Sequence, residues 1–591
     1  MSSNNQNAKR SYRIDLLKAA AIVAVVFYHS GNLEYGYLGV EVFLVIAGYF
    51  FMNSYLRKSE HDQINHIIFF IEKVLRLWPL IIIVCATCLC LGYFSMLPDD
   101  YENLGQSVVA SSAFANNILS AITTKNYWNF SNNYKPLMHL WYVGVLVQLY
   151  FVFTIVLWLS RKCSKRCLKW VIAGMAIASF ALYILPIATT GDKFYYIPFR
   201  AFEILLGACV RLFSNKNKKL SSKVSGFLVP VFTVLICVVM CFGTPFNASI
   251  ALFLEVLLTS VAVYVITNSE EKDNKVLRQI SSIGVASFSI YIVHQPIMAF
   301  VRYFYTAELT GMVLVGVILL TAVLSFLLYF LVESRIGRLI KRVGLVKGCL
   351  GCLCLSVITI AVGLLIYNNA GVVRDVPELD VYKATAYRGM HAEYVDFPYS
   401  WNKDFETDKL HVLVVGDSMA RDWCNILNES GNSDKYEISY VYGSKFNEEY
   451  QRRADVADYI FYACIGDSTE QIPEFLKNYT ENENFFVVGI KNFGECNGQI
   501  YQNRFRDDYF ESSIIMGKTN SVPGLTFEEQ NEKQKEFWGE HYIDMIECVR
   551  NEDGSIPVFT DKNKYISADT EHLTKNGAIY YADILDLSFI E

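Results

Sequence analysis

Apolar stretches of about 20 residues recur through the first part of this chain and end near residue 368. Such a stretch crosses a bilayer as a helix, because backbone groups in lipid must satisfy their own hydrogen bonds. The sequence therefore predicts a polytopic α-helical membrane domain of ten spans, followed by one linking span. The eleven spans centre near residues 14–31, 37–55, 67–94, 139–160, 168–188, 195–213, 226–243, 247–267, 284–305, 311–333 and 347–367.

The rest of the chain has the composition of a soluble domain. The whole chain is 53% hydrophobic and only 19% charged, and the charged residues concentrate after the last span. Short β-rich runs there alternate with polar helical stretches, which predicts a parallel sheet with crossover helices in a three-layer α/β domain. These runs are 411–415, 436–442, 459–464 and 485–490. We expect a membrane domain over 1–340, a linking helix over 341–370, a linker over 371–408 that docks on or wraps the soluble domain, and an α/β domain over 409–591.

The loops between the predicted spans differ in charge. Lys and Arg cluster on one side, at 57–58, 161–166, 216–223, 272–278 and 335–347, and acidic residues prevail on the other, at Glu34, Asp99, Asp100, Glu102, Asp192 and Glu308. Because cytoplasmic loops carry the excess of positive charge, the N-terminus is predicted to be cytoplasmic. An odd number of spans then places the α/β domain outside the cell membrane. The polar stretch 1–10 and the absence of a cleavage site indicate no cleavable signal peptide.

Charge and cysteine usage narrow the possible partners. The net charge of -6 argues against a nucleic-acid partner. Most of the 15 cysteines lie in or beside apolar segments, where Cys behaves as a small hydrophobe. The closely spaced ones have no His or Asp cluster beside them, so we expect no metal site; they are Cys163, Cys167, Cys349, Cys352 and Cys354. Pairing among Cys424, Cys464, Cys496 and Cys548 of the α/β domain stays open.

Several ionisable residues fall inside the predicted spans. Burying such groups in lipid is costly, so each is a candidate functional residue. Their alternative role is to fix helix packing as buried pairs, and for Arg200 and Glu203, three residues apart on one helical face, both readings stay open. The candidates are His29, Glu41, His139, Arg200, Glu203 and His294.

The segments around these residues resemble motifs of the integral-membrane acyltransferase-3 family, in the right order and at the right spans. The resemblance covers about residues 11 to 340. The matching segments are 14–18 with Tyr28-His29, 39–43 with 47–49, 139–142 with 148–150, 199–207, and 287–296.

The resemblance implies that the membrane domain takes an acyl group, usually acetyl, from a cytoplasmic acyl-CoA and makes it available outside. His29 would be the acid/base group or the transient acceptor. The phosphates of the donor would meet Lys18, Lys73 and Arg76, and Glu41, His139, Arg200, Glu203 and His294 would belong to the membrane site. Acyl-CoA is a substrate here, and no bound cofactor is expected. The family's usual first-span arginine is Lys18 in this chain, which keeps the charge and loses the bidentate fork; Arg13 is a possible substitute. An acidic residue that usually precedes the Gln148 position is also absent.

A second group of residues points to covalent chemistry outside the membrane. Gly416-Asp417-Ser418 follows an apolar run, and Asp569 and His572 come three residues apart near the chain end. A strand and tight turn presenting a serine, with a His and an Asp supplied later, is what a hydroxyl nucleophile needs. The same tripeptide recurs at 466–468 without partners at a matching position, which we interpret as coincidence.

This second half resembles the SGNH hydrolase/transferase superfamily over about residues 409 to 591. The resemblance implies that Ser418 is the nucleophile, His572 the general base and Asp569 the residue that orients the imidazole. Gly443 and Asn492 match the oxyanion-hole positions, alongside the backbone N–H of Ser418. Asn492 could instead be an ordinary turn residue.

Together the two halves predict a bacterial plasma-membrane O-acyltransferase, by expectation an O-acetyltransferase. It would move an acyl group from acyl-CoA through Ser418 to hydroxyls of a cell-envelope polysaccharide, such as peptidoglycan, capsule, teichoic acid or lipopolysaccharide O-chain. Its expected partners are the acyl-CoA donor, the glycan acceptor and the lipid bilayer. Two alternatives stay open: a glycan-binding export component without covalent catalysis, and a membrane-anchored carbohydrate esterase.

Overall fold

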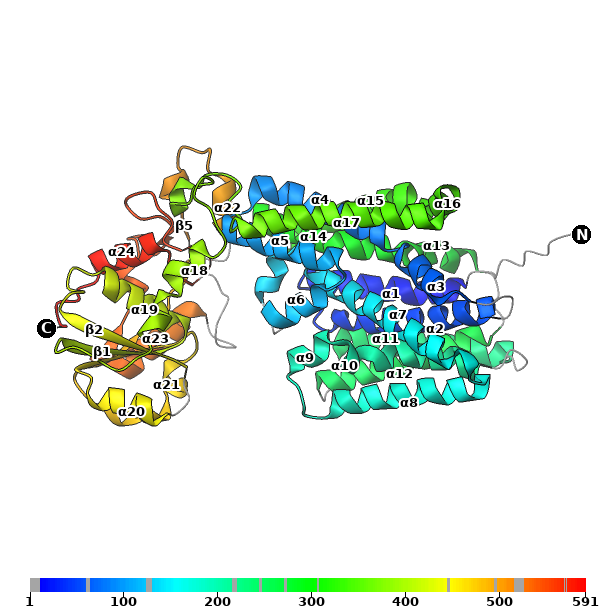
Figure 1. Ribbon diagram of the computed structural model, residues 1–591, viewed down its shortest axis with the longest axis horizontal. Helices are drawn as coiled ribbons and strands as arrows, with labels where there is room; N and C mark the ends of the chain where they lie inside the picture. The colour runs from blue at the N-terminus through cyan, green and yellow to red at the C-terminus, as the bar shows by residue number, and fades with distance from the viewer. Residues whose placement is uncertain are drawn as a thin grey trace, which may run out of the picture. The chain divides into compact units, whose positions relative to one another are not determined.

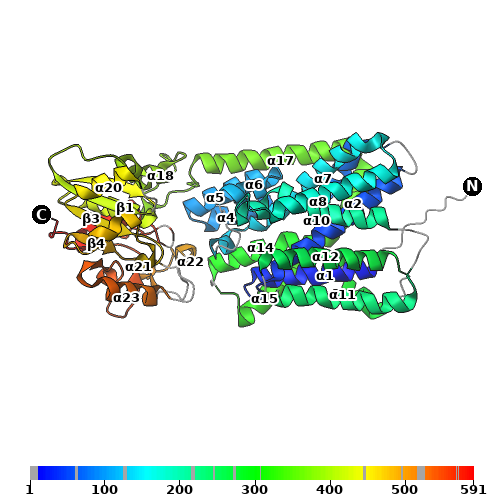
Figure 2. The same cartoon turned by 90° about the horizontal axis from the view of Figure 1, so that it is seen from below.

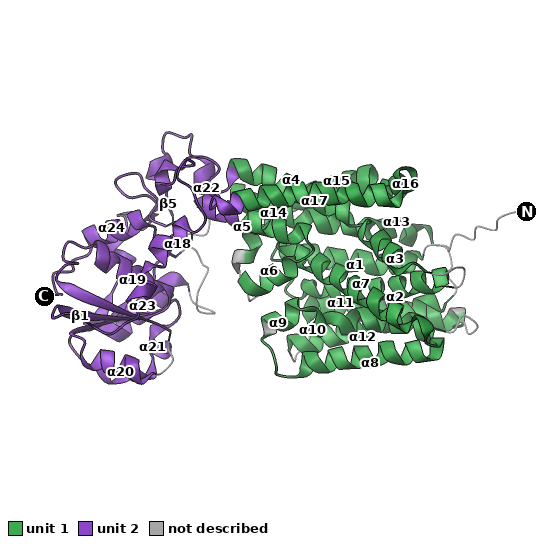
Figure 3. Cartoon of the chain, in the orientation of Figure 1, with its two compact units in different colours: residues 1–94, 104–365 green, residues 95–103, 366–591 purple. Residues whose placement is uncertain are grey.

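The chain folds into two compact units, shown in different colours in Figure 3. Unit 1 consists of Met1–Phe94 and Leu104–Leu365, and unit 2 of Ser95–Asn103 and Ile366–Glu591. The computed structural model describes residues 11–59, 64–123, 130–214, 220–243, 247–269, 274–305, 308–443, 447–493, 497–514, 526–567, 569 and 571–590.

Unit 1 is built from helices, most of which run alongside one another in both views (Figures 1 and 2). The helices up to the end of this unit are α1 (Tyr12–His29), α2 (Gly39–Ser59), α3 (His66–Val74), α4 (Trp78–Ser95), α5 (Pro98–Ser112), α6 (Asn116–Thr123), α7 (Trp141–Leu159), α8 (Lys165–Ile184), α9 (Thr190–Tyr195), α10 (Ile197–Phe213), α11 (Ser222–Phe242), α12 (Ala248–Thr267), α13 (Lys275–Val285), α14 (Ser287–Phe304), α15 (Gly311–Leu328), α16 (Ser334–Val343) and α17 (Leu345–Asn368).

Eight helical segments in the described part of the chain are long and apolar enough to cross a membrane, and a pair bent by 54° at α13 and α14 makes up to nine. The eight are Gly36–Ser59, His66–Ser95, Met138–Lys162, Lys165–Ile184, Lys223–Phe242, Ala248–Thr267, Gly311–Val343 and Leu345–Asn368. The protein is therefore a multi-pass membrane protein.

All eleven predicted spans coincide with helices, but α1 and α10 are outside this set. Both are short, with 18 and 17 residues, and both carry ionisable side chains that lower their hydropathy. Asp15 and Lys18 lie on α1, and Arg200 and Glu203 lie on α10. The expected total of eleven thus stays a prediction, and the two helices in question carry candidate functional residues.

The backbones of α2 and α10 pack unusually close together. A Cβ added to Gly48 would lie 1.8 Å from the carbonyl oxygen of Ile204, and one added to Gly207 would lie 1.9 Å from that of Val45. Small residues allow such close approach between membrane helices. The two glycines therefore bring the helix of Glu41 against the helix that carries Arg200 and Glu203.

Unit 2 centres on a five-stranded parallel sheet in the order β2-β1-β3-β4-β6. Its strands are β1 (Leu410–Gly416), β2 (Tyr436–Tyr442), β3 (Tyr459–Ala463), β4 (Phe485–Val488) and β6 (Tyr542–Ile543), and β5 (Ser513–Ile514) pairs antiparallel with β7 (Ile556–Pro557). The first four strands coincide with the predicted β-rich runs, so the parallel α/β character is confirmed. The two-residue strand β6 lies outside those runs.

Alternate residues of the buried strand β1 point to opposite faces, as the pleat requires. Val412 and Val414 pack into one hydrophobic cluster with Trp423 of α19, whereas Leu413 and Val415 pack into a second cluster on the other face. Helices on both faces complete the three layers (Figure 1). The helices of this unit are α18 (Met390–Val395), α19 (Ser418–Glu429), α20 (Glu448–Asp455), α21 (Ser468–Gln471), α22 (Asn497–Gln502), α23 (Phe527–Trp538) and α24 (Lys575–Ile584), of which α22 packs in a separate cluster through Tyr501.

The segment predicted as a linker packs into unit 2. Val372, Val376 and Val381 join a hydrophobic cluster with Tyr509 and Tyr565. A short piece from much earlier in the chain joins the same cluster through Leu97, and Gln502 and Arg374 donate hydrogen bonds to the carbonyl oxygens of Ser95 and Met96, each at 2.5 Å. The sequence pattern gave no sign that Ser95–Asn103 belongs with the later domain.

Candidate functional site

The serine predicted as the nucleophile stands at a sharp strand-to-helix turn. β1 ends at Gly416 and α19 begins at Ser418. Gly416 has φ +147°, and a Cβ there would lie 1.7 Å from the carbonyl oxygen of Ala463, so only glycine fits. Asp417 caps α19: one carboxylate oxygen accepts the N–H of Met419 at 2.9 Å, and the other accepts the N–H of Ile465 at 2.8 Å. Each residue of the tripeptide thus has a defined task.

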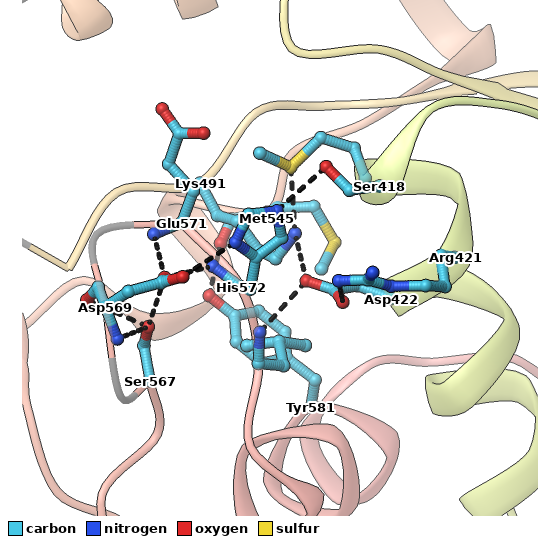
Figure 4. A network of polar contacts seen from close by, with 12 residues as sticks. Ser418, Arg421, Asp422, Lys491, Met545, Ser567, Asp569, Glu571, His572 and Tyr581 are labelled. Atoms are coloured by element: carbon cyan, nitrogen blue, oxygen red, sulfur yellow. Dashed lines mark hydrogen bonds and ion pairs between the residues drawn. The ribbon is translucent and has the colours of Figure 1, made fainter. Parts of the chain in front are cut away.

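The predicted His and Asp meet this serine in one chain of hydrogen bonds (Figure 4). His572 Nε2 lies 2.8 Å from Ser418 Oγ, and His572 Nδ1 lies 2.7 Å from Asp569 Oδ2. The other oxygen of Asp569 accepts the backbone N–H groups of Glu571 and His572, each at 2.8 Å. Ser418, His572 and Asp569 therefore have the geometry of a nucleophile, its base and the group that orients the base.

The charges of this triad support one another. Desolvation favours the neutral imidazole, but the hydrogen bond and negative charge of Asp569 outweigh it and raise the pKa of His572. Desolvation likewise acts to raise the pKa of Asp569, and the hydrogen bond and charge of His572 outweigh it, so the net shift is downward. The carboxylate therefore stabilises the imidazolium that forms when His572 accepts a proton.

The sequence motifs did not single out Glu571, which neighbours the triad. Burial, followed by the negative charges of Asp569 and Asp417 and opposed by His572 and Lys491, raises the pKa of Glu571 to about 6. A carboxyl group with a raised pKa beside a nucleophile is a recognisable signal of a functional site, but it requires coordinates to detect.

The predicted oxyanion donors differ in what the structure shows. Asn492 is buried in the loop after β4. Ser418 begins α19, and the first N–H of a helix has no acceptor within the helix. Gly443, by contrast, donates its backbone N–H to the carbonyl oxygen of Gly416 at 2.9 Å. The N–H that its predicted role requires is thus engaged at the end of the sheet.

The repeated tripeptide at 466–468 has a different environment. Ser468 is buried, donates to Gln534 Oε1 at 2.6 Å and accepts from the indole N–H of Trp538 at 3.0 Å. Its hydroxyl contacts an amide and an indole where Ser418 contacts a histidine. Ser468 thus holds α21 against α23.

In unit 1, three of the predicted histidines lie together. The imidazole ring of His294 is 5.1 Å from that of His29 and 5.3 Å from that of His139, centroid to centroid. All three are buried. Within the described part of the chain, both ring nitrogens of His139 and Nε2 of His294 lack a hydrogen-bond partner. The arrangement joins the 3-10 turn Met138–Leu140 just before α7, the end of α1 and the middle of α14 into one cluster of proton-carrying groups.

A second group of predicted residues forms a buried ion cluster. Arg200 donates to both carboxylate oxygens of Glu41, at 2.8 and 2.9 Å, and its Nε lies 3.1 Å from Glu203. Its guanidinium also lies over the ring of Trp141, at 5.7 Å. Glu255 of α12 is fully buried, and among the described residues its carboxylate has no hydrogen-bond partner. Sequence analysis missed Glu255, although an acidic residue inside a predicted span is the signal that identified the others.

Two of the predicted phosphate-binding residues, Lys18 and Lys73, lie over aromatic rings of α2. The Nζ of Lys18 lies 5.3 Å from the ring centroid of Phe50. The Nζ of Lys73 lies 5.8 Å from the ring centroid of Phe51, the residue after Phe50. Arg76 follows three residues after Lys73. Lys18 also pairs with Asp15 at 3.4 Å. Because a helix rises 1.5 Å per residue, Lys18 and His29 are separated by about 16 Å along α1.

No group of three or more His, Cys, Asp or Glu side chains with the geometry of a metal site occurs among the residues that the structure describes. Cys424 and Cys464 are buried as free thiols and Cys548 is an exposed one. Cys496, the fourth cysteine of this half, lies outside the described residues.

Comparison with known proteins places the first half of the chain in a family. The acyltransferase-3 family profile, described as an acyltransferase domain, matches residues 11–330. BcsY of Komagataeibacter xylinus, whose name describes a membrane-bound transacylase, is 25% identical over 325 residues, which cover 54% of this chain and 81% of BcsY.

Two further relatives are named as O-acetyltransferases. The O-acetyltransferase OatA of Staphylococcus aureus is 24% identical over 349 residues, or 55% of this chain and 57% of that protein. The peptidoglycan O-acetyltransferase OatA of Listeria monocytogenes is 24% identical over 305 residues, or 48% and 49%. The matches to these two proteins thus span about half of their length, and no solved structure matches the chain. Since the family profile covers more than half of its residues, the chain belongs to the acyltransferase-3 family of membrane-bound acyltransferases.

Proposed function

We propose that this protein is an O-acetyltransferase that moves an acetyl group from acyl-CoA to hydroxyls of a cell-envelope polysaccharide, through an acyl-enzyme at Ser418. The observation that carries the proposal is the hydrogen-bonded chain Ser418–His572–Asp569 on the same polypeptide as an acyltransferase-3 membrane domain. Relatives named as O-acetyltransferases, one of them for peptidoglycan, support the acyl group and the glycan class.

The first half-reaction loads the serine. As Ser418 Oγ attacks the acyl carbonyl, its proton passes to His572 Nε2, and a tetrahedral oxyanion forms. The N–H of Ser418 and the amide of Asn492 are the donors proposed to stabilise that oxyanion. When the intermediate collapses, His572 gives the proton to the leaving group, and the acyl group stays on Ser418 as an ester.

The second half-reaction mirrors the first. A sugar hydroxyl attacks the acyl–serine carbonyl and loses its proton to His572, which then returns a proton to Ser418 Oγ. The acyl group leaves on the sugar oxygen. Asp569 keeps the imidazole in the required orientation and stabilises its charged form in both steps.

The membrane domain supplies the acyl group in this account. Lys18, Lys73 and Arg76 would hold the phosphates of the donor on the cytoplasmic side. The separation of about 16 Å along α1 from Lys18 to His29 allows an extended pantetheine arm to place its thioester near the histidine cluster. His29 would then act as the acid/base or the acceptor, with His139 and His294 as neighbouring imidazoles that exchange protons with it.

The direction of the relay requires a defined topology. The loop charges favour a cytoplasmic N-terminus. With the odd number of spans predicted from the sequence, this orientation would put unit 2 with Ser418 on the outer face of a bacterial plasma membrane. A cell-envelope glycan would meet Ser418 on that side.

Two other functions use the same features differently. A membrane-anchored esterase would use the triad to remove acyl groups, and a glycan-binding export component would need no triad. Against the esterase stands the acyltransferase-3 domain, which is far larger than an anchor requires. Against the export component stands the triad geometry itself.

Covalent labelling separates these functions. A serine-directed phosphonate added to the purified full-length protein is expected to label wild type and Ser468→Ala, and to leave Ser418→Ala unlabelled. Labelling that persists in Ser418→Ala would rule out the proposed nucleophile. An esterase would release acetate from acetylated glycan and would show no dependence on acyl-CoA.

A further inference from the structure

A buried ion pair lies behind the catalytic serine, and the proposed reaction gives it no task. Lys491 Nζ is 2.9 Å from Asp422 Oδ2, and the two residues are only 2% and 1% exposed (Figure 4). Lys491 Nζ also lies 3.0 Å from the sulfur of Met419. The pair is therefore buried, and Met419, the residue directly after the nucleophile, lies against Lys491.

Each member of the pair is next to a catalytic element. Asp422 is one helical turn after Ser418, so both side chains lie on the same face of α19. Lys491 directly precedes Asn492 in the loop after β4. The oxygen of Asp422 that binds Lys491 also accepts the backbone N–H of Leu573 at 2.9 Å, and Leu573 directly follows His572. One carboxylate oxygen thus joins the nucleophile helix, the Asn492 loop and the His572 turn.

Stability alone does not account for such a pair. Removing two charges from water costs several kcal/mol per ion, and well-packed apolar residues of similar volume are often as stable or more stable. An apolar pair, however, could not accept the Leu573 N–H, and it would not fix three separate segments in one geometry.

We propose that Asp422 and Lys491 are positioning residues that hold the His572 turn and the Asn492 loop against the helix of Ser418. This inference rests on the proposed function, because it assigns the pair to the acyl transfer at Ser418. It predicts that the pair acts on the rate of the chemical step more than on substrate binding.

The same charges act on the base. Asp422 acts to raise the pKa of His572, and Lys491 acts to lower it. Asp569 also acts to raise the pKa of His572, and Glu571 interacts with His572 electrostatically; both residues are unchanged in the variants below. The groups that face Asp422 from the surrounding elements are Lys491, Arg421, His572, Cys424, Tyr394 and Tyr581, and Lys491 also faces Glu571.

The two single variants change the charge near His572 in opposite directions, so their pH–rate profiles separate a direct effect on His572 from a general loss of structure. Asp422→Asn can still accept the Leu573 N–H but loses the negative charge, so the acidic limb of the rate profile is expected to move to lower pH. Lys491→Met loses the positive charge, so the limb is expected to move to higher pH. A merely structural role would move neither limb, or both in the same direction.

The test uses full-length protein in detergent, with release of p-nitrophenolate from p-nitrophenyl acetate as the measure of Ser418 acylation. Each single variant is expected to lose about tenfold or more in kcat, with KM within about twofold of wild type. Because breaking a buried pair strongly destabilises the fold, the double variant Asp422→Leu/Lys491→Met replaces the pair with apolar residues. It is expected to fold, to keep the wild-type acidic limb and to remain slow.

Arg453→Met is the matched control, because Arg453 of α20 is another buried cation of unit 2, paired with Asp404 and with Glu449. The acidic limb of the pH–rate profile of Arg453→Met is expected to stay at the wild-type position. Wild-type kcat in the folded double variant, or limbs that move together in the single variants, would overturn the positioning role alone. An undiminished rate in Ser418→Ala would overturn the proposed function, and the positioning role with it.

Discussion

Asp569 holds His572 at two places at once. One carboxylate oxygen accepts the backbone N–H of His572 at 2.8 Å, and the other lies 2.7 Å from the imidazole Nδ1. The spacing of three residues is what permits this, because an aspartate readily accepts N–H groups two and three residues later in a turn. The backbone contact fixes the turn, and the side-chain contact fixes the orientation of the ring toward Ser418.

Asp569→Asn should therefore leave the turn in place and impair the chemistry. An amide can still accept the backbone N–H groups, but it cannot stabilise the imidazolium or enforce the required tautomer. We expect acylation of Ser418 to slow by about 10²- to 10⁴-fold, measured as ester turnover by the purified protein. Asp508→Asn, in an exposed pair with Arg506, is the control and should keep the wild-type rate. A loss of less than about threefold in Asp569→Asn would contradict the assigned role.

The pH dependence follows from the raised pKa of His572. The base must be neutral to accept a proton, so activity should rise with pH through a midpoint above the ordinary imidazole value of about 6.5. In Asp569→Asn the midpoint should move to lower pH. For stability the sign is the reverse: the contribution of His572 is full below about 6.5 and is lost as pH rises through its folded pKa. A wild-type midpoint at or below the ordinary value, from initial rates across pH, would refute this.

Gly416→Ala tests the strand-to-helix turn. The added methyl group would lie 1.7 Å from a backbone oxygen, and the backbone there has φ +147°. Because a backbone neighbour cannot move aside easily, we expect loss of folded protein or a shift of Ser418 that abolishes labelling. Gly431→Ala is the matched control, since nothing lies within 4 Å of its added Cβ. Thermal unfolding and phosphonate labelling of both variants are the measurements; equal behaviour of the two would show that the turn tolerates a side chain.

Arg200→Met tests the ion cluster of the membrane domain. Removing the guanidinium leaves Glu41 and Glu203 buried without a cation, which costs about 3–5 kcal/mol when a buried pair is broken. We expect much less protein in the membrane, with partial recovery in Arg200→Met/Glu41→Gln, because the amide carries no charge. Quantitative immunoblotting of membranes reports the amounts. If abundance is normal and acetylation is lost, the cluster acts in the reaction and is not needed for folding.

The local pattern of the sequence was enough to predict the main elements of the fold. Buried parallel strands produce short runs rich in β-branched and aromatic residues, such as Tyr436–Tyr442, and these lie where expected. The two-residue strand β6 carries no such pattern, because its pairing with β4 depends on tertiary contacts. The same holds for Ser95–Asn103, whose place in unit 2 depends on contacts with residues hundreds of positions later.

Site residues could be predicted from the sequence where their role depends on neighbours close in the chain. Gly416, Asp417 and Ser418 form a turn, and Asp569 and His572 are close in sequence, so motif spacing was enough to find them. The pair Asp422 and Lys491 could not be found in this way, since a charged residue on an amphipathic helix is usually at the surface. Its burial depends on three segments meeting, and only their packing reveals it.

Mass analysis of cell-envelope glycans tests the central claim most directly. Cells producing wild-type protein, Ser418→Ala or Ser468→Ala would be compared at equal protein abundance in the membrane. The account predicts that an acetyl group on a glycan hydroxyl is present with wild type and Ser468→Ala and absent with Ser418→Ala. Glycan acetylation that is unchanged in Ser418→Ala would contradict it.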